Sequence, residues 1–114
     1  MTIRRVVPAV PCADIPASTT FYGLLGFEEV MNHGWVAGLA SPSTPAAQVL
    51  LVGDDPSGVR PDLSIEVDDV DTAHADMVRH GADIVYGISD EPWGVRRFFV
   101  RDPNGRIVNV LTHQ

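Results

Sequence analysis

The side chains that could recognise a ligand gather at alternate positions near the C-terminus of the chain. Residues 95–101 and 106–111 are rich in β-branched and aromatic types and flank Asp-Pro-Asn-Gly, which predicts two strands joined by a tight turn. Pro103 suits the first central position of a type I turn, and Gly105 can adopt the left-handed conformation that closes the hairpin. Such a turn fixes which residues of the two strands face each other.

The register predicted from this turn separates the hairpin into two unlike faces. One face is wholly apolar and suits burial beneath a helix: Phe98, Val100, Val108 and Val110. The other face mixes a cation, an aromatic ring and an amide with two aliphatic side chains: Arg97, Phe99, Ile107, Asn109 and Leu111. A guanidinium can pair with an anionic or carbonyl group, a ring can stack, and an amide can orient a ligand through neutral hydrogen bonds. We therefore expect the mixed face to form the wall of a wet ligand pocket.

Residues 62–67 offer further polar side chains on a second predicted strand. One side of this strand is apolar and the other polar: Leu63, Ile65 and Val67 against Asp62, Ser64 and Glu66. Asp62 or Glu66 could pair with a cation or act as a general base, and Ser64 could supply a neutral hydrogen bond. Either carboxylate could instead form a purely structural ion pair with Arg97.

The strands and helices that must position these residues repeat in the two halves of the chain. Each half predicts a strand, a helix and three further strands: residues 3–10, 14–25, 27–32, 35–40 and 48–52, then 63–67, 69–80, 82–88, 95–101 and 106–111. The halves superpose with an offset of 55, so that Asp14, Gly26 and Val30 correspond to Asp69, Gly81 and Val85. This predicts one α+β domain, 1–114, built from two βαβββ modules, about 1–55 and 60–114, with cupped mixed sheets and the helices on their outer faces.

Two local features refine this scheme. Pro8 donates no hydrogen bond to a sheet, so we expect the first strand to be an edge strand or to bulge there. In the first helix, Phe21 and Leu25 lie four residues apart on the face that we expect to pack. The second helix begins after either Asp69 or Asp71, both of which are suitable N-caps.

Composition limits the classes of function. A chain of 114 residues is long enough for one domain with a real core. Its net charge of -7 argues against general nucleic-acid binding, and no apolar run approaches the roughly 20 residues needed to cross a bilayer. Cys12 is the only cysteine, which excludes an internal disulfide and a cysteine-based zinc cluster. With no secretory signal visible, these features predict a cytoplasmic protein that binds neither nucleic acid nor membrane.

Three motifs along the chain resemble those of the vicinal oxygen chelate superfamily, which includes glyoxalase I, extradiol dioxygenases, and fosfomycin- and bleomycin-resistance proteins. They are Asp14-Ile15-Pro16 followed by Phe21-Tyr22 and Leu25-Gly26-Phe27, then the stretch from Asp62 to Asp71, then Phe98 to Gly105. The resemblance covers essentially the whole chain. It implies the glyoxalase/bleomycin-resistance fold, a small-molecule ligand and a homodimer.

The resemblance also predicts the absence of a metal and of any other cofactor. Metal-using members of the superfamily place one ligand, chiefly His or Glu, in each of four strands. The matching positions here are Val7, Gln48 or Leu50, Asp62 and Asn109. Valine cannot ligate, and neutral amides are weak donors for a transition metal, which leaves Asp62 as the only strong ligand. The four histidines are scattered and are not expected to replace the missing donors.

In metal-using relatives the cavity is lined from positions three, five and nine before the turn aspartate, which here are Phe99, Arg97 and Trp93. Trp93 and Trp35 are the candidates for stacking, although Trp35 could equally belong to the core. The full set of candidate ligand-binding residues is Trp35, Asp62, Ser64, Glu66, Trp93, Arg97, Phe99 and Asn109.

Three functions remain open. The first is a metal-free protein that binds or sequesters an organic ligand, such as an antibiotic-like molecule, by aromatic stacking and polar contacts. The second is a lyase, isomerase or dioxygenase, either metal-dependent or with Glu66 or Asp62 as base. The third is a regulatory or structural module whose pocket is filled by its own side chains. The resemblance to the bleomycin-resistance proteins and the loss of the ligand set favour the first.

Overall fold

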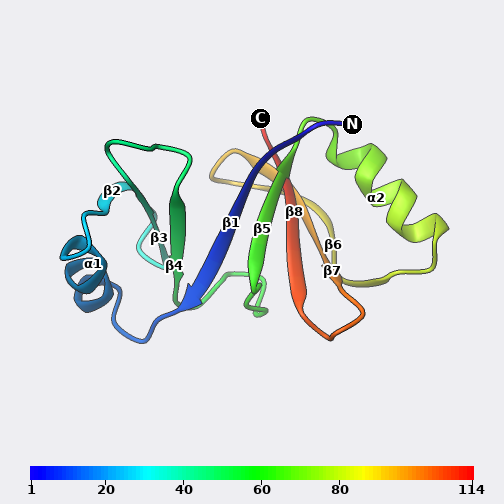
Figure 1. Cartoon of the computed structure of the whole chain (residues 1–114). Helices are drawn as coiled ribbons and strands as arrows, with labels where there is room; N and C mark the ends of the chain where they lie inside the picture. The colour runs from blue at the N-terminus through cyan, green and yellow to red at the C-terminus, as the bar shows by residue number, and fades with distance from the viewer. The chain divides into compact units, whose positions relative to one another are not determined.

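The computed structural model describes residues 1–114 and contains two helices and eight strands, coloured along the chain in Figure 1. The chain divides into two compact units. We call Val7–Arg60 the N-terminal unit, and Met1–Val6 together with Pro61–Gln114 the C-terminal unit. Strand β1 (Ile3–Pro11) begins in the C-terminal unit and continues into the N-terminal unit. No helix is both long and apolar enough to span a membrane.

The C-terminal unit has the predicted order of one strand, one helix and three strands. Its elements are β5 (Leu63–Val67), α2 (Val70–Arg79), β6 (Asp83–Glu91), β7 (Val95–Arg101) and β8 (Ile107–His113). The strand order is β5-β8-β7-β6, with β5 parallel to β8 and the other two pairs antiparallel. The start of β1 joins this unit, because Thr2 and Asp68 exchange two hydrogen bonds.

The β7–β8 hairpin has the predicted register, with Phe99 opposite Asn109 and Val100 opposite Val108. Its turn is closed by Asp102, whose backbone N–H donates a 2.8 Å hydrogen bond to the Arg106 carbonyl and whose carboxylate accepts hydrogen bonds from the backbone N–H groups of residues 104 and 106. Gly105 has φ +84°, a conformation that side chains other than glycine rarely adopt. The local sequence therefore sets the pairing on which the two faces of the hairpin depend.

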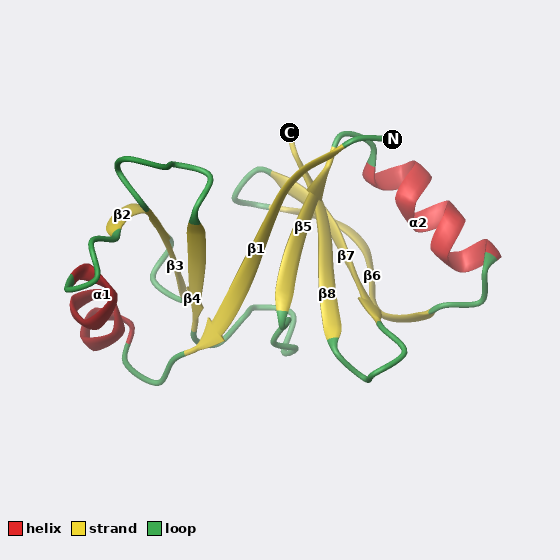
Figure 2. Ribbon diagram, in the orientation of Figure 1, coloured by secondary structure: helices red, strands yellow, loops and turns green.

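The apolar face of this hairpin is buried against α2, as predicted. Figure 2 shows the helix beside the strands, and its contacts are with β6, β7 and β8. The core comprises Val67, Val70, Ala73, Phe98, Val100 and Val110. Asp69 caps α2 by accepting hydrogen bonds from the Thr72 backbone and hydroxyl at 3.0 and 2.7 Å. The helix thus holds the far side of the hairpin and leaves the mixed face for other contacts.

The N-terminal unit has the same order of elements. They are the later part of β1, α1 (Ile15–Gly23), β2 (Glu28–Asn32), β3 (Val36–Ala40) and β4 (Gln48–Val52). The strand order is β2-β3-β4-β1, with β4 and β1 parallel. The core comprises Cys12, Ala37, Leu39, Val49 and Leu51, with Val10, Ile15, Tyr22 and Phe27 packed against it. These two units confirm the α+β class and the repeated βαβββ order.

One local prediction in the N-terminal unit is wrong, and one alternative of a second is excluded. Phe21 is 61% exposed and Leu25 is 72% exposed, so they do not form the packed face of α1. The helix ends at Gly23, and it reaches the core through Ile15 and Tyr22, which lie seven residues apart on one stripe. Strand β1 lies between β4 and β5 in the strand order, so the alternative of an edge strand is wrong, whereas the alternative of a bulge at Pro8 stays a prediction. Its missing N–H at Pro8 falls just before the pairing with β4 begins at residue 9.

Candidate ligand-binding site

The mixed face of the β7–β8 hairpin is more deeply buried than a wet pocket wall would be. Arg97 is 3% exposed, Phe99 is fully buried, and Asn109 is 8% exposed. Part of this burial comes from β6, where Tyr86 lies opposite Phe99 with the ring centroids 5.1 Å apart. The face is therefore a close-packed mixture of rings and polar groups, which differs from the open wall that the alternation predicts.

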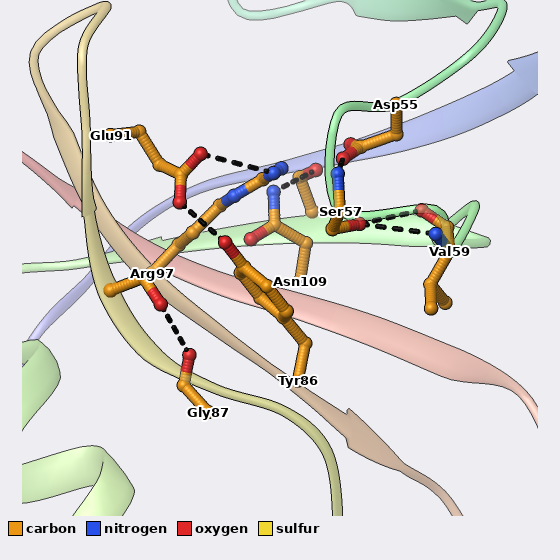
Figure 3. A network of polar contacts seen from close by, with 10 residues as sticks. Asp55, Ser57, Val59, Tyr86, Gly87, Glu91, Arg97 and Asn109 are labelled. Atoms are coloured by element: carbon orange, nitrogen blue, oxygen red, sulfur yellow. Dashed lines mark hydrogen bonds and ion pairs between the residues drawn. The ribbon is translucent and has the colours of Figure 1, made fainter.

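Arg97 lies among three aromatic rings, of which that of Tyr86 is drawn in Figure 3. Its guanidinium carbon is 4.8 Å from the ring centroid of Phe99, 4.9 Å from that of Trp93 and 5.4 Å from that of Tyr86. A cation at these distances is attracted by the negative faces of the rings. The rings come from β7, from the β6–β7 turn and from β6, so the hairpin pairing assembles the cluster. Trp93 is half-buried in that turn, beside the positive-φ residue Gly94.

Glu91 completes this cluster and was not singled out from the sequence. One carboxylate oxygen accepts a 2.7 Å hydrogen bond from the Tyr86 hydroxyl, and the other lies 3.4 Å from a terminal nitrogen of Arg97. The Glu91 side chain is 8% exposed and that of Arg97 is 3% exposed. A buried guanidinium needs a countercharge at close range. Glu91 supplies it, whereas the sequence indicated Asp62 or Glu66 as the partner of Arg97.

The signal that could have found Glu91 is the β6–β7 hairpin itself. Glu91 pairs with Val95 across the turn, and paired residues point to the same side of a sheet. Val95 and Arg97 also share a side, because side chains alternate along a strand. Glu91 is therefore the diagonal neighbour of Arg97.

Asn109 and Ser64 form a second polar contact on the mixed face. They are register partners in the parallel pair β5–β8, and the Asn109 amide nitrogen donates a 3.1 Å hydrogen bond to the Ser64 hydroxyl. Ser64 is 3% exposed. The amide oxygen of Asn109 is buried and has no hydrogen-bond partner. An acceptor in this state carries a desolvation cost of about 1–3 kcal/mol.

The two carboxylates of the original candidate set make other contacts. Glu66 lies 2.7 Å from the Nδ1 atom of His113 and 3.4 Å from Arg5. Asp62 accepts a 2.8 Å hydrogen bond from the Ile107 backbone and has a side chain that is 42% exposed. Both therefore hold neighbouring strands of the C-terminal unit together. The hydrogen bonds and ion pairs of these two carboxylates are with residues other than Arg97.

Trp35 belongs to the N-terminal unit. It immediately precedes β3, is half-buried, and its carbonyl accepts a 2.8 Å hydrogen bond from Gly53. It also borders an open hollow of about 490 Å³ together with Cys12, Ile15 and Gly34. The C-terminal unit brings together Trp93, Arg97 and Phe99, and joins Ser64 to Asn109.

The residues present do not fit the transition-metal centre that metal-dependent members of the superfamily use. Val7 is apolar and only 1% exposed, and the Asn109 amide is engaged with Ser64. No three His, Cys, Asp or Glu side chains gather in a group that could hold a metal ion. Neutral amides and a valine are poor substitutes for the imidazoles and carboxylates that such ions prefer.

The comparisons with known proteins agree with the fold. A structure from Vibrio splendidus 12B01, described as a glyoxalase/bleomycin resistance protein/dioxygenase superfamily member, is 23% identical, with a TM-score of 0.68 over 97% of this chain and 99% of that chain. Methylmalonyl-CoA epimerase from Mycobacterium tuberculosis is 25% identical, with a TM-score of 0.70 over 98% of this chain and 87% of that chain.

A Legionella pneumophila structure, described as an NAD-dependent benzaldehyde dehydrogenase, is 16% identical, with a TM-score of 0.76 over 96% of this chain and 99% of that chain. No curated protein sequence matches significantly. The model of the Glyoxalase/Bleomycin resistance protein/Dioxygenase superfamily matches residues 3–110, which is nearly the whole chain. The chain therefore belongs to the glyoxalase/bleomycin resistance protein/dioxygenase superfamily.

Proposed function

We propose that the protein binds a small, planar organic molecule at the mixed face of the C-terminal unit without a metal. The observation that carries this proposal is the cluster of Arg97 with the rings of Tyr86, Trp93 and Phe99. The charge of the Arg97 guanidinium is compensated by the Glu91 carboxylate at 3.4 Å, so the cluster does not require a strongly charged ligand. Flat rings and a delocalised guanidinium favour a flat guest.

The ligand class that we propose is an antibiotic-like aromatic compound, bound for sequestration and released unchanged. Two features support binding over chemistry. The donor set does not fit a metal centre, and both oxygens of the buried carboxylate Glu91 already accept contacts from Tyr86 and Arg97. The half-buried Trp93 is the proposed stacking residue, with Ser64 and Asn109 as polar contacts.

Fluorescence with single-tryptophan variants tests this proposal. Trp35→Phe leaves Trp93 as the only indole, and Trp93→Phe leaves Trp35. Titration with metal-free bleomycin and with neutral planar aromatics, in EDTA, should give saturable quenching in Trp35→Phe and little change in Trp93→Phe. Trp93→Ala should weaken binding about 2- to 13-fold, the equivalent of one lost stacking contact. Equal quenching in both single-tryptophan variants, or none in either, would contradict the proposal.

An enzymatic function is the second candidate, favoured by the likeness to methylmalonyl-CoA epimerase at 25% identity. In that case a carboxylate of the C-terminal unit would remove an acidic proton from carbon in a coenzyme A thioester. The three candidate bases are Glu91, which is the carboxylate of the Arg97 cluster and is 8% exposed, and Asp62 and Glu66, which the sequence indicated.

Deuterium exchange separates catalysis from binding. The protein is incubated with methylmalonyl-CoA in D₂O, with and without added divalent metal, and the thioester is analysed by mass spectrometry. Binding alone should leave the rate of deuterium uptake at the buffer rate. Uptake above that rate, lost in one of the variants Glu91→Gln, Glu66→Gln or Asp62→Asn, would establish an enzyme and name its base.

A further inference from the structure

We propose that Asn109 and Ser64 together recognise a ligand with adjacent N–H and C=O groups, as in a lactam or a cyclic imide. This inference rests on the proposed function and deepens it by naming the chemical class of the ligand. It depends on hydrogen-bonding groups that the stacking cluster does not use.

The two side chains are held rigidly. Both lie in the interior of paired strands, as register partners of the parallel pair β5–β8. Ser64 is 3% exposed and Asn109 is 8% exposed. The 3.1 Å hydrogen bond from the amide nitrogen to the Ser64 hydroxyl sets the orientation of the amide. Its oxygen is therefore fixed, buried and without a donor.

This arrangement presents an acceptor and a donor side by side. The Asn109 oxygen can accept one hydrogen bond from a ligand, and the Ser64 hydroxyl, which accepts from Asn109, retains its own proton to donate. A lactam offers the complementary pair, because its N–H donates and its C=O accepts. A carboxylate or an ester offers only acceptors and would place a lone pair against the Asn109 oxygen.

The Asn109–Ser64 pair lies on the same face as the stacking cluster. Asn109 pairs directly with Phe99, and Phe99 pairs with Tyr86, so the amide and the rings lie on one face of neighbouring strands. Figure 3 shows the Asn109 amide on the side where the Tyr86 and Arg97 side chains lie. In this proposal a flat heterocycle stacked on the half-buried ring of Trp93 would point its edge at the Asn109–Ser64 pair.

Two isosteric probes test this inference by calorimetric titration of the purified protein. 2-Quinolone carries the lactam edge, and coumarin has the same shape with a ring oxygen in place of the N–H group. A site built to accept the N–H should bind 2-quinolone at least about tenfold more tightly, because coumarin leaves the buried acceptor unpaired. Asn109→Leu should reduce this ratio to about one.

Ser64→Ala and Trp93→Ala are the control variants for this affinity ratio. Ser64→Ala retains the Asn109 oxygen but frees the amide to rotate, so it should also lower the ratio, and it serves if Asn109→Leu does not fold. Equal affinities in the wild type that both weaken in Trp93→Ala would overturn the lactam inference and leave the proposed binding function standing. Absence of binding by both probes at millimolar concentration would overturn the inference, and the bleomycin titration then judges the proposed function separately.

Discussion

Burial of a permanent charge is the dominant feature of the site at the scale of single residues. The guanidinium of Arg97 carries a positive charge and is only 3% exposed, so its burial must be offset by countercharge and by ring faces. Glu91 and three rings supply both. Tyr86 has a double role, because its ring contacts the cation and its hydroxyl holds the carboxylate at 2.7 Å.

Removing that hydroxyl should therefore destabilise the fold. Tyr86→Phe leaves the ring but deprives the Glu91 carboxylate of a hydrogen bond, which should cost about 1.5–3 kcal/mol. Tyr22→Phe is the matched control, because Tyr22 is half-buried against the N-terminal core with no hydroxyl hydrogen bond. Its effect should stay within about 0.5 kcal/mol. Urea unfolding monitored by circular dichroism measures both, and equal losses in the two variants would count against this account.

At the scale of elements, the site depends on the register of hairpins. The β7–β8 turn aligns Asn109 with Phe99, and the β6–β7 turn brings Glu91 diagonally beside Arg97. Each turn contains a glycine with positive φ, Gly105 in the first and Gly94 in the second. A residue that resists this conformation would strain the turn and loosen the alignment of side chains several residues away.

Gly105→Ala tests the role of the turn against Gly87→Ala. A Cβ at either position meets nothing within 4 Å, so crowding does not distinguish them. Gly105 has φ +84°, whereas Gly87 lies within β6 without a positive φ. Gly105→Ala should lose about 1–2 kcal/mol of folding stability, and Gly87→Ala should be neutral or gain about 0.5 kcal/mol. Equal free energies of unfolding for the two variants would refute the conformational argument.

The cap of α2 should make stability depend on pH. The hydrogen bonds from the Thr72 hydroxyl and backbone lower the pKa of Asp69. The unfolded chain therefore binds this proton more readily, and the contribution is complete above the ordinary aspartate pKa of about 3.9. It is lost as the pH falls through the lowered pKa of the folded state.

Asp69→Asn keeps an N-cap acceptor but removes the ionisation. The urea concentration at the midpoint of unfolding should therefore fall less steeply for this variant than for the wild type as the pH is lowered from about 5 through the aspartate pKa of about 3.9. The pKa of Asp68 is also lowered, chiefly by the Thr2 backbone N–H, so Asp68→Asn should flatten the curve in the same direction. Parallel curves for wild type and both variants would show that neither carboxylate is linked to folding.

At the scale of the whole molecule, the resemblance predicts a homodimer. The N-terminal unit leaves several large apolar side chains in water: Phe21 at 61%, Leu24 at 84%, Leu25 at 72% and Val30 at 64% exposed. Exposed apolar groups favour association. Light scattering at micromolar concentration should give twice the chain mass of 12.3 kDa, and the mass should fall on dilution. A mass equal to that of one chain at every concentration would contradict the predicted homodimer.

The pattern along the chain was sufficient for most of the fold. Asp14 and Asp69 as caps, the Asp-Pro-Asn-Gly turn and the alternation in β5, β7 and β8 are local properties, so short-range chemistry was enough to place them. The same locality explains the failure at α1. Phe21 and Leu25 satisfy the spacing of an amphipathic helix, but which stripe faces the sheet depends on where Gly23 ends the helix and on the sheet itself.

The sequence by itself determined the family motifs, the order of elements and which residues share the mixed face, because side-chain alternation and turn chemistry act over a few residues. Only the tertiary structure decided which of those residues touch. Glu91 rather than Asp62 or Glu66 pairs with Arg97. The amide nitrogen of Asn109 donates a hydrogen bond to Ser64, and its amide oxygen is buried without a partner. Such pairings depend on distances between strands far apart in the chain, and burial sets their strength.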